Sequence, residues 1–156
     1  MKTSPYVLVR KYFNVNNETV VFVVSRLLFL LFLYSAADKL LDYQKFRIQL
    51  GQSPMLTAFA AYIGFGIPIF EMLIAVLVIF PRTMLLGFYA SFTIMVMFTA
   101  YIFVLMNYSE YVPCSCNGIL EGASWGQHLG FNIIFLFLAA AGVLMRSKMN
   151  SKYSIN

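Results

Sequence analysis

The chain has 156 residues, of which 61% are hydrophobic and only 11% are charged. A soluble globular domain carries about 25% charged residues, so this composition excludes a soluble protein and indicates a membrane protein in contact with lipid. The net charge of +5 resides in tails and loops, where it predicts membrane orientation, and we therefore expect no nucleic-acid partner.

The first apolar run extends over residues 20–37 and is interrupted only by Ser25 and Arg26. It predicts a membrane-spanning helix behind a polar tail at residues 1–19. A cleaved signal peptide is the alternative, because residues 35–37 are small, as at a cleavage site. The run exceeds the usual signal core of about 7 to 15 residues and contains an arginine, which favours the helix.

The segment at residues 38–54 is only partly apolar, and its large apolar side chains recur at helical spacing while charged ones occupy the other faces. These apolar residues are Leu40, Tyr43, Phe46 and Leu50. The pattern predicts a short amphipathic helix in the membrane interface.

Two further spans are predicted at residues 55–80 and 84–106. Within the first of these, Gly64, Gly66 and Pro68 are expected to bend or loosen the helix. Each run exceeds the length of about 20 apolar residues that crosses the hydrocarbon.

A polar loop at residues 107–126 leads into a fourth span that ends near Met145. Ser124 and Gln127 have the spacing of a capping box and predict where this helix begins. The fold class is therefore an all-α membrane protein. It is a four-transmembrane-helix bundle at residues 20–145, with a short amphipathic helix after the first span and a basic tail at residues 146–156.

The basic residues predict how this bundle is oriented. With both termini cytoplasmic, the cytoplasmic side holds Lys2, Arg10, Lys11, Arg82, Arg146, Lys148 and Lys152, and the other side holds Lys39, Lys45 and Arg47. The loop at residues 107–126 has no Lys or Arg. The positive-inside rule therefore predicts that it faces the extracytoplasmic space.

Both cysteines of the chain, Cys114 and Cys116, lie in this loop. A disulfide between them reaches the usual Cα separation of roughly 4.4 to 6.8 Å only with strain, so it is expected to be easily reduced. The loop faces an oxidising compartment, and the pair predicts thiol-disulfide exchange. Because no further cysteine can relay electrons, exchange requires an external partner protein or a membrane-soluble oxidant.

Two other interpretations of the cysteines remain. The first is an inert disulfide that shapes the loop, although so small a ring restricts little chain entropy. The second is a metal site formed with Glu121 and His128, but their spacing matches no common zinc pattern, and we expect no metal.

His128, about one turn into the fourth helix, is the third predicted catalytic residue, because an imidazole there can carry the proton that joins or leaves a sulfur. An interfacial histidine that only hydrogen-bonds the loop is the alternative. Trp125 is either an interfacial anchor or a group that covers the disulfide or stacks on a quinone.

Charged residues inside a span cost about 3 kcal/mol each and need partners or water. Arg26 and Glu71 lie about six and nine residues from the cytoplasmic ends of their helices, so their depths differ by roughly 5 Å. We predict that they form an ion pair that fixes helix packing, or that serves a proton or a quinone headgroup. Asn132, one turn past His128, either bonds another helix or lines a cavity. The candidates for binding a quinone cofactor are Trp125, Asn132, Arg26 and Glu71.

Several of these residues, in order and spacing, resemble the DoxX-like membrane proteins and, within them, the MauE branch associated with methylamine utilisation and disulfide chemistry. The resemblance covers Arg26 to about Leu144. It rests on Arg26, Ser35-Ala36-Ala37-Asp38-Lys39, Phe46, Pro68-Ile69-Phe70-Glu71 and Cys114-Ser115-Cys116-Asn117-Gly118.

The resemblance implies a four-helix protein of the bacterial inner membrane whose periplasmic Cys-x-Cys pair serves oxidative folding of an exported partner, alongside a thioredoxin-like protein. The architecture is also similar to vitamin K epoxide reductase and to quinone-linked thiol oxidases, which use more cysteines. This chain departs from the family pattern at Ala36, where glycine is frequent, and at Asn117, where an aromatic residue is common.

The leading hypothesis is therefore an integral membrane thiol-disulfide redox protein that supports disulfide formation or maturation of an exported partner. Two alternatives belong to other classes. One is a non-catalytic subunit or assembly factor of a larger membrane complex, and the other is a quinone-binding respiratory subunit of the DoxX type.

Overall fold

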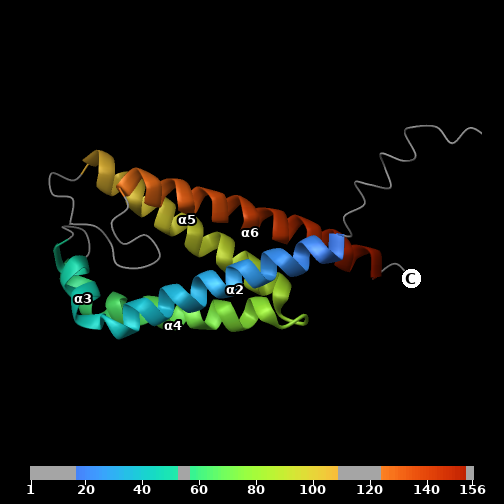
Figure 1. The fold of residues 1–156 in the computed structure, drawn as a ribbon, viewed down its shortest axis with the longest axis horizontal. Helices are drawn as coiled ribbons and strands as arrows, with labels where there is room; N and C mark the ends of the chain where they lie inside the picture. Colours follow the sequence, from blue (N-terminus) through green and yellow to red (C-terminus); the bar gives the residue numbers. More distant parts are fainter. Residues whose placement is uncertain (1–16, 53–56, 109–123, 154–156) are drawn as a thin grey trace, which may run out of the picture.

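The computed structural model describes residues 17–52, 57–108 and 124–153, and every element in these ranges is helical. Within them, four helices are long and apolar enough to cross a membrane. The elements are α2 (Asn17–Leu41), α3 (Tyr43–Gln52), the 3-10 turn η1 (Thr57–Phe59), α4 (Ala60–Ile79), α5 (Met84–Tyr108) and α6 (Trp125–Tyr153). The predicted all-α bundle with a short helix after the first span is confirmed (Figure 1).

The four long helices form two antiparallel pairs, α2 with α4 and α5 with α6. The pairs meet near the turn between α4 and α5 and diverge toward the opposite end, where α3 lies (Figure 1). We call these the turn end and the α3 end. The start of α2 and the end of α6 lie at the turn end, whereas the end of α5 and the start of α6 lie at the α3 end.

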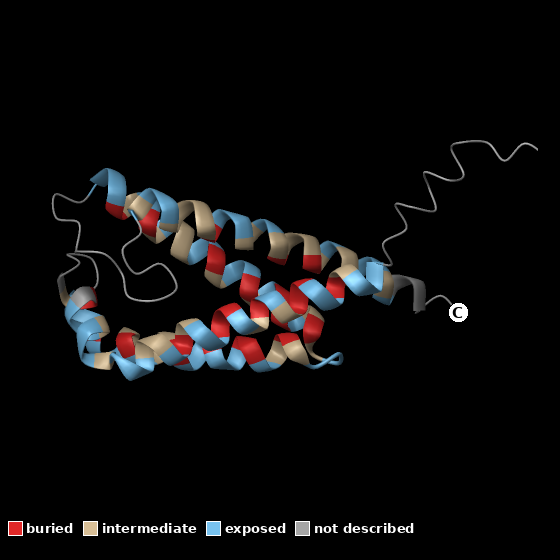
Figure 2. Ribbon diagram, in the orientation of Figure 1, coloured by how far each residue is buried: buried red, intermediate tan, exposed pale blue. Residues whose placement is uncertain are grey.

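The hydrophobic core occupies the half of the bundle nearer the turn end. Figure 2 shows its buried residues as a band inside the crossing of the two pairs. Its members are Val21, Val24, Leu28, Leu31 and Phe32 of α2, Ile74, Ala75 and Val78 of α4, Met84, Phe88 and Met95 of α5, and Ala139 of α6. The inward-facing positions of the other half are therefore left for different side chains.

Close backbone approaches fix the crossing. The Ser25 hydroxyl donates to the Val78 carbonyl at 2.8 Å, which sets the register of α2 on α4. A Cβ on Gly87 would lie 2.6 Å from the Val78 nitrogen, and one on Gly142 would lie 2.7 Å from the Phe88 ring. Small residues at helix contacts let backbones approach in this way in membrane proteins.

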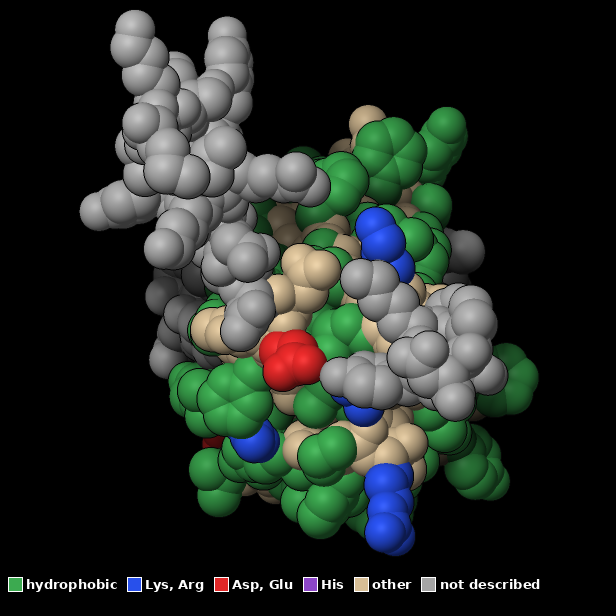
Figure 3. All heavy atoms as spheres, turned by 90° about the vertical axis from the view of Figure 1, so that its right-hand side faces the viewer, with side chains coloured by type: hydrophobic (Ala, Val, Ile, Leu, Met, Phe, Trp, Pro, Cys, Tyr) green, Lys and Arg blue, Asp and Glu red, His purple; other side chains and the backbone are tan. Residues whose placement is uncertain are grey.

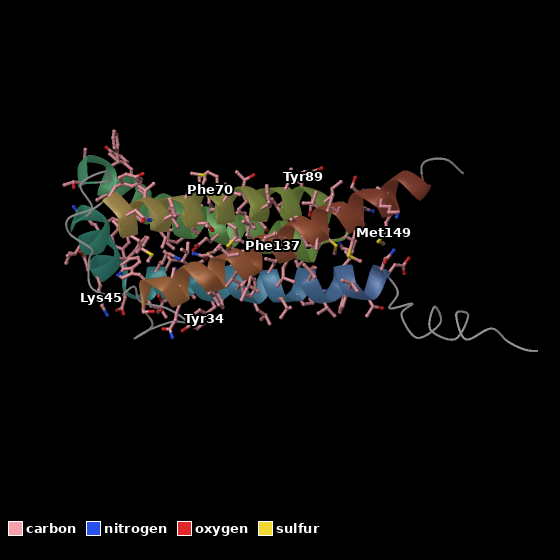
Figure 4. All side chains as sticks on the ribbon, turned by 90° about the horizontal axis from the view of Figure 1, so that it is seen from above. Tyr34, Lys45, Phe70, Tyr89, Phe137 and Met149 are labelled. Carbon is pink, nitrogen blue, oxygen red and sulfur yellow. The ribbon has the colours of Figure 1, made fainter. Side chains whose placement is uncertain are left out.

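The outer surface of the bundle is apolar. In the view from above, the side chains of Phe70 and Tyr89 project from one edge and that of Tyr34 from the other (Figure 4). All three are about half exposed or more. An apolar outer surface around a partly polar interior is the arrangement that a helix bundle in lipid requires.

The short helix α3 has the amphipathic character that its spacing predicts. Leu50 is buried, Tyr43 and Phe46 are half-buried, and Lys45 is exposed. Leu50 and Tyr43 pack on Gly64 of α4, where a Cβ would lie 3.5 and 3.7 Å from their side chains. The bundle thus holds α3 across the start of α4.

Basic residues collect at the turn end. Figure 3 views the molecule from this end and shows Lys and Arg side chains among hydrophobic ones. Arg146 donates through Nη2 to the Pro81 carbonyl at 2.9 Å, which ties α6 to the turn between α4 and α5. The helix α6 continues to Tyr153, past the predicted end near Met145, because the basic residues that follow the apolar run are also good helix formers.

The crossing generates a prediction about Gly87. Gly87→Ala places a methyl group against the backbone of Leu77 and Val78, which cannot move as a flexible side chain can. We expect a loss of about 1 to 3 kcal/mol in the free energy of unfolding, measured in detergent micelles by thermal or denaturant unfolding. Gly66→Ala in α4 is the matched control, since nothing lies within 4 Å of its Cβ. The control is expected to be neutral or slightly stabilising, and equal losses in both variants would contradict the close approach.

Candidate functional site

An ion pair between α2 and α4 lies in the half of the bundle toward the α3 end. The ammonium of Lys39 donates to both carboxylate oxygens of Glu71, at 2.9 and 3.1 Å. The Ser35 hydroxyl donates to Glu71 Oε1 at 3.0 Å, and Lys39 also donates to the hydroxyl and carbonyl oxygens of Ser35. Each carboxylate oxygen thus has at least one donor.

The surroundings explain why the pair is so fully bonded. The Glu71 side chain is only 1% exposed, whereas that of Lys39 is 19% exposed. A buried carboxylate without a partner costs several kcal/mol, so an ammonium and a hydroxyl at this position offset its desolvation. Phe46 of α3 adds its ring face, 5.7 Å from Lys39 Nζ. The charges of Lys39 and Glu71 thus offset each other, and the site contains residues from three helices.

The predicted pair between Arg26 and Glu71 is wrong, because Glu71 is bonded to Lys39. The register of the helices gives the physical reason. Ser25 is level with Val78, so Arg26 lies beside the end of α4, about 10 Å along the axis from Glu71 at 1.5 Å per residue. The prediction assumed that the start of α2 and the end of α4 are level, but with Ser25 beside Val78 the first turns of α2 extend past the end of α4.

Arg26 has a different environment. Its guanidinium lies 4.5 Å from the centre of the Phe22 ring, one turn earlier on α2. The arrangement is a cation–π contact on the outer part of the bundle, and the side chain is half-buried. The structure therefore separates Arg26 from Glu71, with which it was grouped as a candidate cofactor ligand.

The start of α6 contributes two of the candidate residues. The capping box predicted there is confirmed: the Ser124 amide donates to Gln127 Oε1 at 2.8 Å, and the Gln127 amide donates to the Ser124 hydroxyl at 3.3 Å. Trp125 and His128 lie on the first turns, with ring centroids 6.5 Å apart. Both residues lie at the α3 end of the bundle, where α2 also ends.

Asn132, one turn beyond His128, is buried, with 6% of its surface exposed. Its Nδ2 has no hydrogen-bond partner among the residues that the structure describes. The prediction left open whether Asn132 bonds another helix or lines a cavity, and in the described chain this amide nitrogen bonds no other helix.

Cys114 and Cys116 lie outside the described residues, so their roles remain predictions. The described residues on either side of them are Tyr108 of α5 and Ser124 before α6, and both are at the α3 end. Within the described part of the chain, no group of three or more His, Cys, Asp or Glu side chains is arranged to hold a metal ion.

Sequence reasoning missed Lys39, Ser35 and Phe46 as members of the site. Lys39 was used as an outside charge and, with Ser35 and Phe46, as part of the family resemblance, but none of the three was grouped with Glu71. Two signals pointed to Lys39: a serine one turn earlier on the same helix face, and a long stem that lets an ammonium reach several ångströms along the helix. The apolar spacing placed Phe46 on the inner face of α3 without indicating its cationic neighbour.

A family model described as Methylamine utilisation protein MauE matches residues 17–145. The match spans all four long helices and agrees with the resemblance that extends from Arg26 to about Leu144. No curated protein and no solved structure matches the chain at a significant level. The match and the four apolar helices together identify a multi-pass membrane protein.

The ion pair generates a prediction about Lys39. Lys39→Met leaves the Glu71 carboxylate buried without its cation, and we expect a loss of about 3 to 5 kcal/mol in the free energy of unfolding. Adding Glu71→Gln removes the unpaired charge and should recover most of this loss. Unfolding in detergent micelles, combined in a double-mutant cycle, measures both effects.

Arg26→Met is the control for this cycle, since Arg26 contacts Phe22 and not Glu71. We expect it to cost only about 0.5 to 1 kcal/mol, with no rescue by Glu71→Gln. If Glu71→Gln rescued Arg26→Met and not Lys39→Met, Glu71 would pair with Arg26, which would contradict the structure.

The capping box generates a prediction about Ser124. Ser124→Ala removes the hydroxyl that accepts from the Gln127 amide, so α6 should fray at its start and lose about 1 kcal/mol. Hydrogen exchange of the first-turn amides of α6 should accelerate, while exchange in α4 stays unchanged. Ser147→Ala, at an exposed position near the other end of α6, is the control and should leave both unchanged.

Proposed function

This chain belongs to the MauE family of methylamine utilisation proteins, and from that membership we propose that it is an integral membrane thiol-disulfide redox protein. Cys114 and Cys116 exchange a disulfide with an exported partner protein and so support the maturation of that partner. A thioredoxin-like protein is the expected donor or acceptor of the disulfide.

The observation that carries this proposal is the gathering of polar groups at the α3 end. The chain segment with the cysteines leaves α5 and enters α6 there. The same end holds the capped start of α6, His128 and the Lys39 ammonium. A helix N-terminus favours a thiolate, the form of cysteine that reacts.

The described charges support the proposed orientation. Arg82, Arg146 and Lys148 lie at the turn end, whereas the α3 end holds Lys45 and Arg47 of α3 and Lys39, which is paired with Glu71. The positive-inside rule then places the turn end in the cytoplasm and the α3 end in the periplasm of a bacterial inner membrane. In this proposal residues 20–145 form the membrane domain, and the tails at 1–19 and 146–156 are cytoplasmic.

The proposed disulfide exchange takes place in two steps. A partner thiolate attacks the Cys114–Cys116 disulfide, whose sulfur–sulfur bond breaks as a mixed disulfide forms. The second partner thiolate displaces this bond, which leaves the partner oxidised and both cysteines as thiols. Reoxidation passes two electrons and two protons to an external oxidant, because the chain has only two cysteines. His128 is the proposed carrier of a proton between sulfur and water.

The proposal predicts that a single-cysteine variant traps the mixed disulfide. In Cys116→Ala or Cys114→Ala, produced in cells that grow on methylamine, the remaining thiolate can attack the disulfide of an oxidised partner, the reverse of the step above, and the covalent adduct should accumulate because no second cysteine resolves it; acid quenching and alkylation preserve it for detection. The adduct should disappear on reduction, and growth on methylamine should be lost. The double variant Cys114→Ala/Cys116→Ala controls for adducts through other groups and should show none.

A second variant separates this function from a non-catalytic role. If Cys114→Ser/Cys116→Ser supports growth on methylamine at the wild-type rate, thiol exchange is not the function. The chain would then act as a membrane subunit or assembly factor whose loop needs no redox chemistry.

A further inference from the structure

The turn between α4 and α5 carries positive charge that thiol exchange does not use. Arg82 is exposed in this turn, and Arg146 and Lys148 of α6 lie at the same end of the bundle. Among the described residues, Glu18 at the start of α2 is the one carboxylate at this end. The turn end therefore has an excess of positive charge, which attracts anions.

The guanidinium of Arg146 is fixed beside Arg82. Its Nη2 donates to the Pro81 carbonyl at 2.9 Å, and that carbonyl belongs to the same peptide unit as the Arg82 nitrogen. The Nε of Arg146 is enclosed, so the terminal nitrogens are the ones available to a ligand. The bond to Pro81 lies in an exposed part of the structure and uses only one of the N–H donors of the group. Two arginines, one of them held in place, thus meet at one turn.

Neither arginine is paired with a carboxylate of the described chain, where the one salt bridge is that of Lys39 and Glu71. Two neighbouring guanidinium groups repel each other, and an oxyanion between them replaces this repulsion with charge-assisted hydrogen bonds. The planar fork of a guanidinium binds phosphate oxygens in bidentate fashion, which makes arginine a residue of choice for phosphate. Arg82 and Arg146 are therefore suited to a phosphate group.

The turn lies at the level of the lipid headgroups. It connects two candidate membrane spans, Thr57–Ile79 and Met84–Tyr108, so it lies where the chain leaves the hydrocarbon. Phe80 and Leu86, on either side of the turn, are 57% and 59% exposed. Lys and Arg side chains lie among hydrophobic ones at this end (Figure 3). A ligand here meets cationic groups and an apolar surface together.

This combination selects one kind of ligand. A free phosphate ion satisfies the arginines but makes no use of the apolar surface beside them. The headgroup of phosphatidylcholine brings its own cation next to two guanidinium groups. A phospholipid with a net negative charge uses both the arginines and the apolar surface, and basic pockets between membrane-spanning helices bind such headgroups.

We propose that Arg82 and Arg146 bind the phosphate of one anionic phospholipid, whose acyl chains lie against the apolar surface beside the turn between α4 and α5. The headgroup joins α6 to this turn in addition to the bond from Arg146 to Pro81, and so stabilises the end at which the helix pairs meet. The site lies at the opposite end from the start of α6, goes beyond the proposed thiol exchange and does not require the cysteines.

The test measures the melting temperature of the full chain in dodecyl maltoside, an uncharged detergent, at about 0.15 M salt, where distant charges are screened. Dioleoyl phosphatidylglycerol, added stepwise, should raise the melting temperature saturably, because it binds the folded bundle. Dioleoyl phosphatidylcholine, which has the same chains, should give a smaller shift. Inorganic phosphate, which has no chains, should give none.

Arg82→Gln removes one guanidinium from an exposed position. It should raise the apparent Kd for phosphatidylglycerol about tenfold or more, the effect of a lost charge-assisted hydrogen bond. Arg146→Gln should weaken binding at least as much, but it also loses the bond to Pro81. Arg82→Gln therefore tests the site even if Arg146→Gln does not fold.

Lys148→Gln is the matched control, because it removes the same charge from the same end of the bundle. Lys148 is exposed and lies two residues after Arg146, so it points about 200° away around α6. This variant should leave the apparent Kd nearly unchanged.

Three results would overturn the proposal. In the first, phosphatidylglycerol gives no saturable shift or shifts the melting temperature no more than phosphatidylcholine does. In the second, inorganic phosphate reproduces the shift, which identifies a site for the free ion. In the third, Arg82→Gln weakens binding no more than Lys148→Gln, which indicates only a general attraction of charge. Repeating the titration in Cys114→Ala/Cys116→Ala, with an unchanged Kd expected, separates this result from the thiol proposal.

Discussion

The ion pair between Lys39 and Glu71 is the constraint on which the rest of the structure depends. A carboxylate that is 1% exposed cannot be kept in a membrane protein without a cation, so α2 and α4 can associate only in the register that joins the two groups. The hydrogen bond from Ser25 to Val78 holds the same register at the other end of the contact. The pair thereby sets where α3 begins and where α5 and α6 can pack.

Much of this arrangement follows from the sequence. The apolar runs specify the spans, because only helices of that length satisfy their backbone groups in lipid, and the Ser124–Gln127 spacing specifies the start of α6. The ion-pair partner of Glu71 could not be predicted from the sequence. An error of a few residues at a helix end displaces a depth estimate by several ångströms, and the long Lys39 side chain reaches further than its backbone position suggests. The neighbours of Glu71 therefore depend on helix register, which apolar patterning specifies only weakly.

The two halves of the bundle differ in content: one holds most of the hydrophobic packing, and the other holds buried polar groups. The half toward the turn end contains the hydrophobic core and the glycine contacts, so it supplies packing. The half toward the α3 end contains the ion pair, His128 and Asn132, whose Nδ2 bonds none of the described residues, so it holds polar groups in a low-dielectric interior.

The position of the two charges on successive spans also bears on how the chain enters the membrane. During synthesis α2 emerges before α4, and its Lys39 can extend toward the lipid headgroups while it waits. Glu71 lies near the middle of α4, where its shorter side chain cannot reach the lipid headgroups. Its burial in the bilayer therefore costs free energy, which the ion pair with Lys39 offsets. Insertion of α4 is thus coupled to its docking on α2. The ion pair therefore favours insertion of the two spans as one hairpin.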